Sequence, residues 1–437
     1  MIDRVLEAAD PAALTRKYIS RTGSDLRIAS ISHDTTQGRV YVVAVGKASI
    51  PMMAAAANQL GPSLHNGIVI TKSRDQKHLE KILADSELPA NISVYGAGHP
   101  ISDRRSVIAT VAVSKLVDKA GKRDLVLCLI SGGASALLSQ PILPLRDWQE
   151  LTNALLASGC TINELNIVRK QLDVIKGGGL AQKAAPATCL SLILSDVVGN
   201  PLDIIGSGPT VPNPDPPEAA RQVLRRYHLD QTLSPEVWQR IEDHFAMAKA
   251  EPHAVPATLK NTIIGDVRLA ARAAAEAAAE LGFDAQVLTT HLEGEAAEVG
   301  RVIGALAKDA PSGTCLLLGG ETTVTLRGQG KGGRNQEVVL AAAMALDGEK
   351  NVVVASLATD GDDGPTGAAG AIISGETLSS ARSKGIDARA YLDNNDSYNF
   401  FRQVGGLIQT GQTGTNVNDL LFILKYGATL SSTVVFD

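Results

Sequence analysis

The sequence has few aromatic residues, only four cysteines and no long apolar run, and each shortage excludes a class of protein. Phe, Trp and Tyr make up 3% of the 437 residues, and 41 Lys and Arg stand against 46 Asp and Glu, a net charge of -5. Such a chain offers neither base-stacking platforms nor a basic face, so we expect no nucleic acid partner. The cysteines form no C-x-x-C pair, which argues against a zinc site or a disulfide framework.

No apolar run approaches the length that spans a membrane. The first residues, MIDRVLEAADPAALTRKY, carry charges where a secretory signal would have an apolar core. We therefore expect a cytoplasmic protein with a small-molecule partner and no membrane attachment. Because 437 residues exceed the size at which a single hydrophobic core stops growing, two domains are expected.

Short apolar runs alternate with alanine-rich segments of helical period, which is typical of β-α-β units and of a parallel sheet covered on both faces. The predicted domains are 1–250 and 259–437, joined by EPHAVPAT at 251–258. We predict strands at 39–46, 67–72, 92–96, 124–131, 188–196, 261–266, 284–290, 314–320, 322–327 and 351–358. Predicted helices include a stretch after Ser102, one from Thr161 to Gly177 that opens with a Thr161–Glu164 capping box, and 267–281, 294–308 and 335–346.

Ligands of open α/β sheets bind beyond the carboxyl ends of the strands, and four places in the first domain qualify. Lys47 follows the first strand and could neutralise a phosphate or carboxylate, although a solvated lysine is the alternative. Ser131-Gly132-Gly133-Ala134-Ser135 could hold an anion through backbone N–H groups, or be a plain tight turn. Asp196 could accept a proton or hold a metal, or merely cap a turn. Gly206-Ser207-Gly208 could add backbone donors.

The densest pattern in the second half begins with Gly319-Gly320-Glu321-Thr322 and continues through the glycine-rich loop 328–333 into a helix. Lys331 and Arg334 lie at the positive end of that helix dipole, where a bound polyanion would relieve the conflict and a basic hairpin is the alternative. We select Arg334, on what reads as an exposed loop, to stabilise charge on a transferring phosphoryl group. Asn335 follows it.

A further pattern is the acidic run TDGDDGPTG at 359–367, which contains Asp360 and Asp363. Carboxylates this close together repel one another unless a cation or solvent relieves them, so this run indicates a metal or nucleotide contact or else a solvated acidic loop. Several familiar motifs are missing from the chain: G-x-x-x-x-G-K-[ST], the protein-kinase H-R-D-L set, H-E-x-x-H and G-x-S-x-G. The first strand also lacks the dinucleotide fingerprint G-x-G-x-x-G.

Taken in order, nine segments of the chain resemble the type-2 glycerate kinase family, whose members often carry the label hydroxypyruvate reductase. They are VGKAS (45–49), GHPISD (98–103), LISGGASALL (129–138), NIVRKQLDVIKGGGLA (166–181), LILSDVVGNPLDIIGSGPT (192–210), GGETTVTLRGQGKGGRNQE (319–337), ATDGDDGPTGAAGA (358–371), NNDSY (394–398) and TGTNVNDL (413–420). The resemblance covers nearly the whole chain. One departure is Ala134, where the family often has a third glycine.

The resemblance implies ATP-dependent, Mg²⁺-requiring phosphorylation of D-glycerate to 2-phosphoglycerate. The expected fold is a Rossmann-like domain plus a smaller C-terminal α/β domain of the MOFRL type, with the active site in the cleft between them. Lys47, Asp196 and Arg334 match the family's catalytic positions. Part of 385–410, around Asn394-Asn395-Asp396 and Tyr398, is implied to pack back on the first domain. A homodimer is left open, and an NAD(P)H-dependent hydroxypyruvate reductase is the alternative activity.

These expectations assign roles to named residues. Cofactor contacts are expected at Ser131, Gly132, Gly133, Ala134, Ser135, Gly206, Ser207, Gly208, Gly319, Gly320, Glu321, Thr322, Lys331, Asn335, Asp360 and Asp363. The expected Mg²⁺ ligands are Asp196, Glu321 and Asp360.

Overall fold

The structure is a computed structural model that describes all residues except 85, 248–257 and 428–437. The chain divides into two compact units. We call Pro11–Ser195 with Asn200–Ile264 the N-terminal unit, and Gly265–Asp437 with Met1–Asp10 and Asp196–Gly199 the C-terminal unit. The predicted ranges 1–250 and 259–437 therefore miss two short segments, 1–10 and 196–199, that belong to the C-terminal unit. The predicted linker at 251–258 falls almost entirely outside the described residues.

The N-terminal unit is built on a sheet in the order β6-β5-β4-β7-β8-β9, with parallel ladders from β6 through β8. Its strands are β4 (Val40–Val45), β5 (Leu64–Lys72), β6 (Ile92–Ala97), β7 (Leu125–Ile130), β8 (Thr188–Leu194) and β9 (Leu259–Gly265), and a separate antiparallel meander holds β1 (Ile19–Thr22), β2 (Asp25–Ile28) and β3 (Ile31–Asp34). Its α-helices are α2 (Pro11–Tyr18), α3 (Ser49–Leu60), α4 (Gln76–Ala84), α5 (Arg104–Val117), α6 (Ala134–Leu137), α7 (Leu145–Ala157), α8 (Ile162–Leu172), α9 (Gly179–Ala184), α10 (Pro217–Arg226), α11 (Leu229–Thr232) and α12 (Pro235–Met247).

Strand order in this sheet creates a topological switch point. From β4 the chain first builds outward through β5 and β6, then returns to the other side of β4 for β7 and β8. The strands β4 and β7 are fully buried, as expected of strands covered on both faces. The carboxyl ends of β4 and β7 are therefore adjacent, and side chains that follow them share one edge of the sheet.

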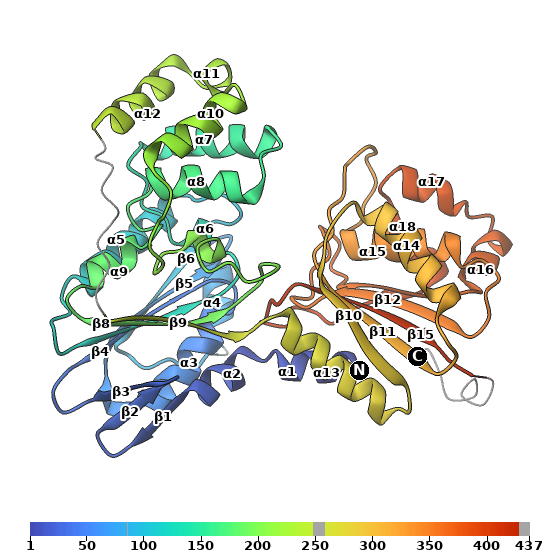
Figure 1. Cartoon of the computed structure of the whole chain (residues 1–437), viewed down its shortest axis with the longest axis horizontal. Helices are drawn as coiled ribbons and strands as arrows, with labels where there is room; N and C mark the ends of the chain where they lie inside the picture. Colours follow the sequence, from blue (N-terminus) through green and yellow to red (C-terminus); the bar gives the residue numbers. More distant parts are fainter. Residues whose placement is uncertain (85, 248–257, 428–437) are drawn as a thin grey trace. The chain divides into compact units, whose positions relative to one another are not determined.

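The C-terminal unit has a mixed sheet in the order β10-β11-β15-β12-β13-β14. Its strands are β10 (Asp284–Leu292), β11 (Thr314–Gly320), β12 (Val352–Ala358), β13 (Gly370–Ser374), β14 (Leu407–Ile408) and β15 (Asp419–Lys425), and its helices are α1 (Ile2–Ala8), α13 (Val267–Glu280), α14 (Ala296–Asp309), α15 (Arg334–Ala345), α16 (Thr377–Ser383), α17 (Ala388–Asp393) and α18 (Ser397–Val404). Figure 1 shows α13 on one face of the sheet, with α14 and α15 on the other. An α/β fold with one parallel and one mixed sheet is thus confirmed.

Some predicted elements are wrong. The strand predicted at 261–266 is β9, which lies beside β8 in the first sheet instead of opening the second. The segment 322–327 is not a strand in the structure; it forms an isolated bridge between Thr323 and Glu295. The helix predicted to reach Gly177 ends at Leu172, although its Thr161–Glu164 capping box is confirmed. The strands of the β1–β3 meander and β13–β15 were missed; the runs of β1–β3 are short and interrupted by charges, whereas β15 has a continuous apolar run that was overlooked.

The segment 385–410, whose packing on the first domain remains a prediction, contributes to the core of the C-terminal unit. Ala388, Leu392, Phe400 and Phe401 are buried there beside residues of α15.

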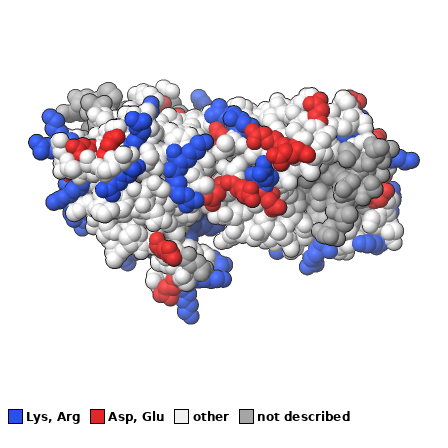
Figure 2. Space-filling view, turned by 90° about the horizontal axis from the view of Figure 1, so that it is seen from below, with Lys and Arg blue, Asp and Glu red and all other residues white. Residues whose placement is uncertain are grey.

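Figure 2 shows one face of the chain, on which basic and acidic side chains are interspersed without a continuous basic track. Over the described ranges, no helix combines the length and apolarity needed to cross a membrane.

Candidate functional site

Lys47 and the glycine turn 131–135 lie together at the switch point of the N-terminal unit. The Lys47 backbone N–H donates to the Gly132 carbonyl at 2.8 Å, and the Ala48 N–H donates to Ser131 Oγ at 3.1 Å. A Cβ on Gly46 would lie 2.2 Å from Ser131 Oγ, so only glycine permits this approach. Ligand sites of doubly wound sheets form at this place.

The glycine turn has free backbone donors. Gly133 takes a left-handed conformation (φ 86°) and leads into α6, which is only four residues long. Within the described part of the chain, the N–H groups of Gly132, Gly133 and Ser135 donate to no acceptor. A helix this short has little macrodipole, so any affinity for an anion would come from these N–H groups themselves.

The Gly206-Ser207-Gly208 turn supports this loop. Ser207 and Gly208 already donate their N–H groups to Ile204 and Ile205 carbonyls, at 2.9 Å each. These two N–H groups are therefore used within the turn itself, and the cofactor contacts of Gly206, Ser207 and Gly208 remain a prediction. The Ser207 hydroxyl instead donates to Ser135 Oγ at 3.1 Å. The turn thus fixes the end of the 131–135 loop.

A buried lysine that the sequence analysis missed connects the two turns. Lys176, 1% exposed, donates through Nζ to the Ser135 carbonyl at 2.7 Å and to the Leu138 carbonyl at 3.0 Å. The next residue, Gly177, donates its N–H to the Ser207 carbonyl at 3.0 Å. Burial lowers the pKa of Lys176 to about 8, while Asp173, 3.8 Å away, opposes that shift.

In the C-terminal unit, Arg334 is held by two carboxylates. It is the first residue of α15, and its Nε and Nη2 donate to the two oxygens of Asp419 at 2.5 and 2.8 Å. Nη1 lies 3.0 Å from Glu321 Oε1. Register explains the meeting, because Asp419 opens β15 directly between Gly320 at the end of β11 and Ala358 at the end of β12.

The sequence suggested that Arg334 lies on an exposed loop. The structure places it on α15, in contact with two carboxylates. Its side chain is 28% exposed and that of Asp419 is 9% exposed. Burial alone would lower the pKa of Arg334, but the hydrogen bonds and charge of Asp419, with the charge of Glu321, raise it. Arg334 is charged at any accessible pH.

Asp196 joins the same cluster through two asparagines. Asn416 Nδ2 donates to Asp196 Oδ2 at 3.0 Å. Asn418 Nδ2 donates both to the Asp196 carbonyl at 2.6 Å and to Glu321 Oε2 at 3.2 Å. The C-terminal unit thus brings Asp196, Glu321 and Arg334 together although they are distant in the sequence.

Asn416, Asn418 and Asp419 were missed as site residues. All three lie in TGTNVNDL, which supported the family resemblance without being given a role. The signal that could have found Asp419 is its place directly before the apolar residues LLFIL, because a polar residue at the end of a buried strand is a candidate site residue.

Several carboxylates of this cluster act on one another electrostatically. Loss of water raises the pKa of Glu321, and the charges of Asp419 and Asp196 add to this while Arg334 opposes it. Burial also raises the pKa of Asp419, with Asp360 adding to the shift. A cation bound beside these carboxylates would favour their charged forms.

This donor set suits Mg²⁺. The available oxygens are carboxylates, and Mg²⁺ commonly uses one or two of them together with water and substrate phosphates. Within the described residues, no three His, Cys, Asp or Glu side chains converge as a complete metal-holding group. Asp196 and Glu321, and Asp360 beside Asp419, fit the partial set that a phosphate-bound Mg²⁺ requires.

Asp363 and Asn335 support the first turn of α15, and their cofactor contacts remain a prediction. Asp363 is fully buried and accepts the N–H groups of Asn335 and Gln336 at 3.0 and 2.9 Å, capping the first turn of α15. Burial raises the pKa of Asp363 to about 6. Asn335, 1% exposed, accepts a hydrogen bond from Ser356. This cap fixes the helix turn that carries Arg334.

The glycine-rich loop 328–333 is held by the Asn394-Asn395-Asp396 segment of the same unit. Asn395 Oδ1 accepts the Gly328 N–H at 3.0 Å, and Asp396 Oδ1 accepts the Lys331 N–H at 2.8 Å. The Lys331 ammonium lies 4.5 Å from the centre of the Tyr398 ring. The segment therefore supports the loop locally.

Gly319, Gly320 and Thr322 lie in closely packed surroundings at the end of β11. A Cβ on Gly319 would lie 2.4 Å from Val267 of α13, and one on Gly320 would lie 2.1 Å from the Leu292 carbonyl. Thr322 is buried. The two glycines are thus needed for close packing around β11 whether or not a nucleotide binds here.

Comparisons with known proteins place the chain in a family. Residues 1–242 match a family described as a domain of unknown function, DUF4147, and residues 314–419 match the MOFRL family. A protein of Thermotoga maritima named D-glycerate 2-kinase is 40% identical over 93% of this chain and 96% of its own length. The crystal structure of a glycerate kinase from the same organism has a TM-score of 0.82 at 38% identity and covers 97% of each chain.

A relative from Agrobacterium vitis, 38% identical over 92% of this chain and 91% of its own length, carries a provisional name as a hydroxypyruvate reductase. With matches of this extent, the chain belongs to the glycerate kinase family. The resemblance noted from the sequence motifs is confirmed.

Proposed function

We propose that this protein transfers the γ-phosphate of ATP to D-glycerate and forms 2-phosphoglycerate. The observation that carries the proposal is the match, over nearly the full length, to relatives named D-glycerate 2-kinase and glycerate kinase. The chemistry of both units supports it. One unit offers a lysine beside open backbone N–H groups, and the other offers an arginine among carboxylates and amides. Phosphoryl transfer needs mainly such positioning and charge stabilisation.

Each group has a proposed part. Lys47 and the N–H groups of the 131–135 turn bind phosphate oxygens or the glycerate carboxylate. Arg334 stabilises negative charge on the transferring phosphoryl group, oriented for this by Asp419. Asp196 orients or accepts a proton from the attacking hydroxyl, and Asn416 and Asn418 fix its position.

Mg²⁺, when bound, would neutralise phosphate charge, and Asp196, Glu321 and Asp360 are the side chains that we propose to hold it. We further propose that the protein works in the cytosol, where ATP is supplied. Removing divalent ions with EDTA should abolish turnover, and added Mg²⁺ should restore it. Full turnover in EDTA would contradict the requirement for Mg²⁺.

The experiment that tests the function measures ADP release from ATP and D-glycerate, with the product identified by phosphorus NMR. The expected result is multiple turnover and a 2-phosphoglycerate resonance. NADH absorbance with hydroxypyruvate is followed in parallel, because a reductase would consume NADH there. NADH consumption without ADP release would overturn the proposal in favour of the reductase, which the missing dinucleotide fingerprint disfavours.

A further inference from the structure

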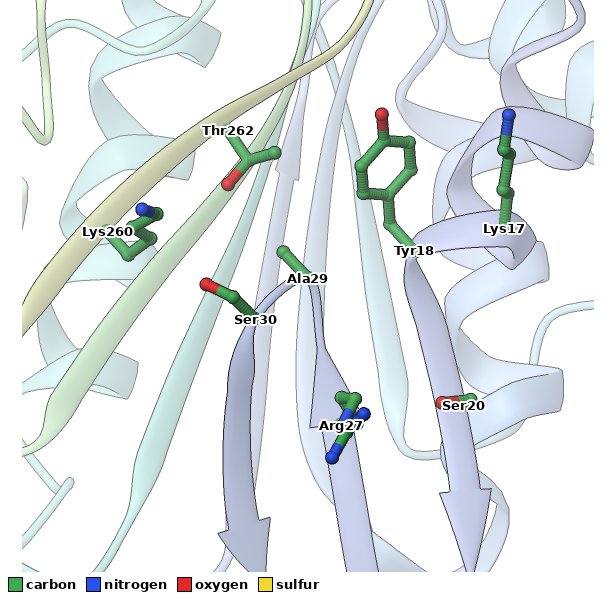
Figure 3. Close-up of a pocket in the computed structure, with 8 residues that line it drawn as sticks. All are labelled: Lys17, Tyr18, Ser20, Arg27, Ala29, Ser30, Lys260 and Thr262. Carbon is green, nitrogen blue, oxygen red and sulfur yellow. The ribbon is translucent and has the colours of Figure 1, made fainter.

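A second candidate binding site lies in the N-terminal unit and uses none of the residues discussed above. It is a hollow of about 550 Å³ lined by Lys17, Tyr18, Ser20, Arg27, Ala29, Ser30, Lys260 and Thr262. Figure 3 shows these side chains, which come from the end of α2, from β1 and β2, from the turn after β2, and from β9. We call it the basic hollow. Small-ligand sites have volumes of about 300–1,000 Å³.

The charge of the basic hollow is one-sided. Lys17, Arg27 and Lys260 line it, and among the described residues none of the three makes an ion pair or a side-chain hydrogen bond. No carboxylate is among its lining residues as the structure describes them. In a chain with a net charge of -5, three unpaired cations around one concavity are unexpected. Their mutual repulsion would be relieved by an anion.

The walls of the hollow are fixed by backbone structure. Ala29 has a left-handed conformation (φ 51°), which residues other than glycine rarely adopt. Its N–H donates to the Tyr18 carbonyl at 2.8 Å, which ties the turn after β2 to the end of α2. Ser30 and Arg27 are thereby held close to the residues from α2.

The opposite wall is equally constrained. Alternate residues of a strand share a face, so Lys260 and Thr262 point to the same side of β9 while Asn261 points to the other. Asn261 exchanges hydrogen bonds with Thr210, accepting at 2.7 Å and donating at 2.9 Å. The backbone of β9 therefore directs Lys260 and Thr262 to the face that lines the hollow.

We propose that the basic hollow binds a small molecule that carries a phosphate or pyrophosphate group. Guanidinium, ammonium and hydroxyl groups are the side-chain donors that bind phosphate oxygens, and all three kinds converge here. The opposing interpretation is that Lys260 only protects β9, an edge strand, against pairing with another chain. The experiment below separates the two.

The test uses pyridoxal 5′-phosphate as the probe. Its phosphate binds cationic sites, and its aldehyde condenses with a lysine amine to an imine with loss of water, which borohydride then reduces to a stable amine. Peptide mass spectrometry reports each lysine separately, so labelling at the kinase site does not interfere. The exposed Lys119 and Lys122, which lie outside the hollow in the same unit, are the matched controls.

We expect Lys17 and Lys260 to label at least fivefold faster than the two control lysines, with inorganic pyrophosphate suppressing only this excess. Arg27→Ala should remove the excess and Arg27→Lys should retain it, both with kinase turnover within about twofold of the wild type. Equal labelling of all four lysines, or an excess that pyrophosphate does not suppress, would overturn the proposal and leave edge protection as the role of Lys260. Failure of the kinase assay would not affect this result.

Discussion

Replacing Arg334 by alanine should harm stability as well as turnover, and the two effects can be separated. The substitution leaves Asp419, whose side chain is 9% exposed, without the guanidinium that neutralises it. Removing one partner of a buried ion pair costs about 3–5 kcal/mol, and the partial exposure of Arg334 places this case near the lower end. For a unit of this size, about 3 kcal/mol corresponds to a Tm lower by about 6–12 °C.

The double variant Arg334→Ala with Asp419→Asn removes the uncompensated charge. Its Tm should recover most of the loss, while its turnover stays about 10³-fold or more below the wild type if Arg334 stabilises the transferring phosphoryl group. Arg382→Ala is the matched control. Arg382 holds Asp347 with the same two-pronged geometry, 2.7 and 3.0 Å, but its side chain is 60% exposed. Because water screens this exposed pair, Arg382→Ala should leave the Tm close to that of the wild type.

The pH dependence gives an independent check. Burial raises the pKa of Asp419, and Arg334 opposes this, so the Arg334→Ala variant should have a still higher pKa at Asp419. A carboxyl whose pKa is raised on folding destabilises the fold above that pKa, and the penalty disappears as the pH falls through it. The deficit of the variant should therefore shrink at acid pH, as measured by urea unfolding. If the Arg334→Ala variant were as stable as the wild type, or if the double variant regained turnover, this reasoning would be refuted.

Three further substitutions test other parts of the structure. Folding raises the pKa of Asp363 from 3.8 to about 6, so wild-type stability should contain a component that is lost as the pH rises from about 4 to about 6. Urea unfolding of Asp363→Asn should lack that component, and an unchanged pH profile would contradict the assignment. Lys176→Met should cost about 1–3 kcal/mol, because it removes the donor to the Ser135 and Leu138 carbonyls in a buried place, and a free energy of unfolding equal to that of the wild type would argue against this role of Lys176. Gly133→Ala introduces strain of about 1–2 kcal/mol at φ 86° and should raise the KM for ATP about tenfold or more. Gly313→Ala, at φ 85° with open space around it, is the control for backbone strain alone, since a Cβ at Gly133 would also lie 3.1 Å from His99: it should leave KM unchanged, and equal KM values in the two variants would exclude the 131–135 turn from ATP binding.

Local sequence patterns were sufficient for much of the fold. The buried strands β4 and β7 are continuous apolar runs, and β5 and β8 are largely apolar over their buried parts, so the existence of all four follows from the chain itself. The capping box of α8 is likewise a local arrangement of two side chains. Lys47 and the 131–135 turn could be nominated because both follow such strands.

Only the tertiary structure decided which distant segments meet. β9 follows the predicted linker in the sequence, but its hydrogen bonds place it in the first sheet. Asp419 became a partner of Arg334 because β15 lies between β11 and β12, and strand order is not written in any local periodicity. Lys176, which reads as one more basic residue near a helix end, is a buried link between two turns. In each case the deciding interaction joins residues far apart in the chain, and its geometry exists only after the strands and helices have packed.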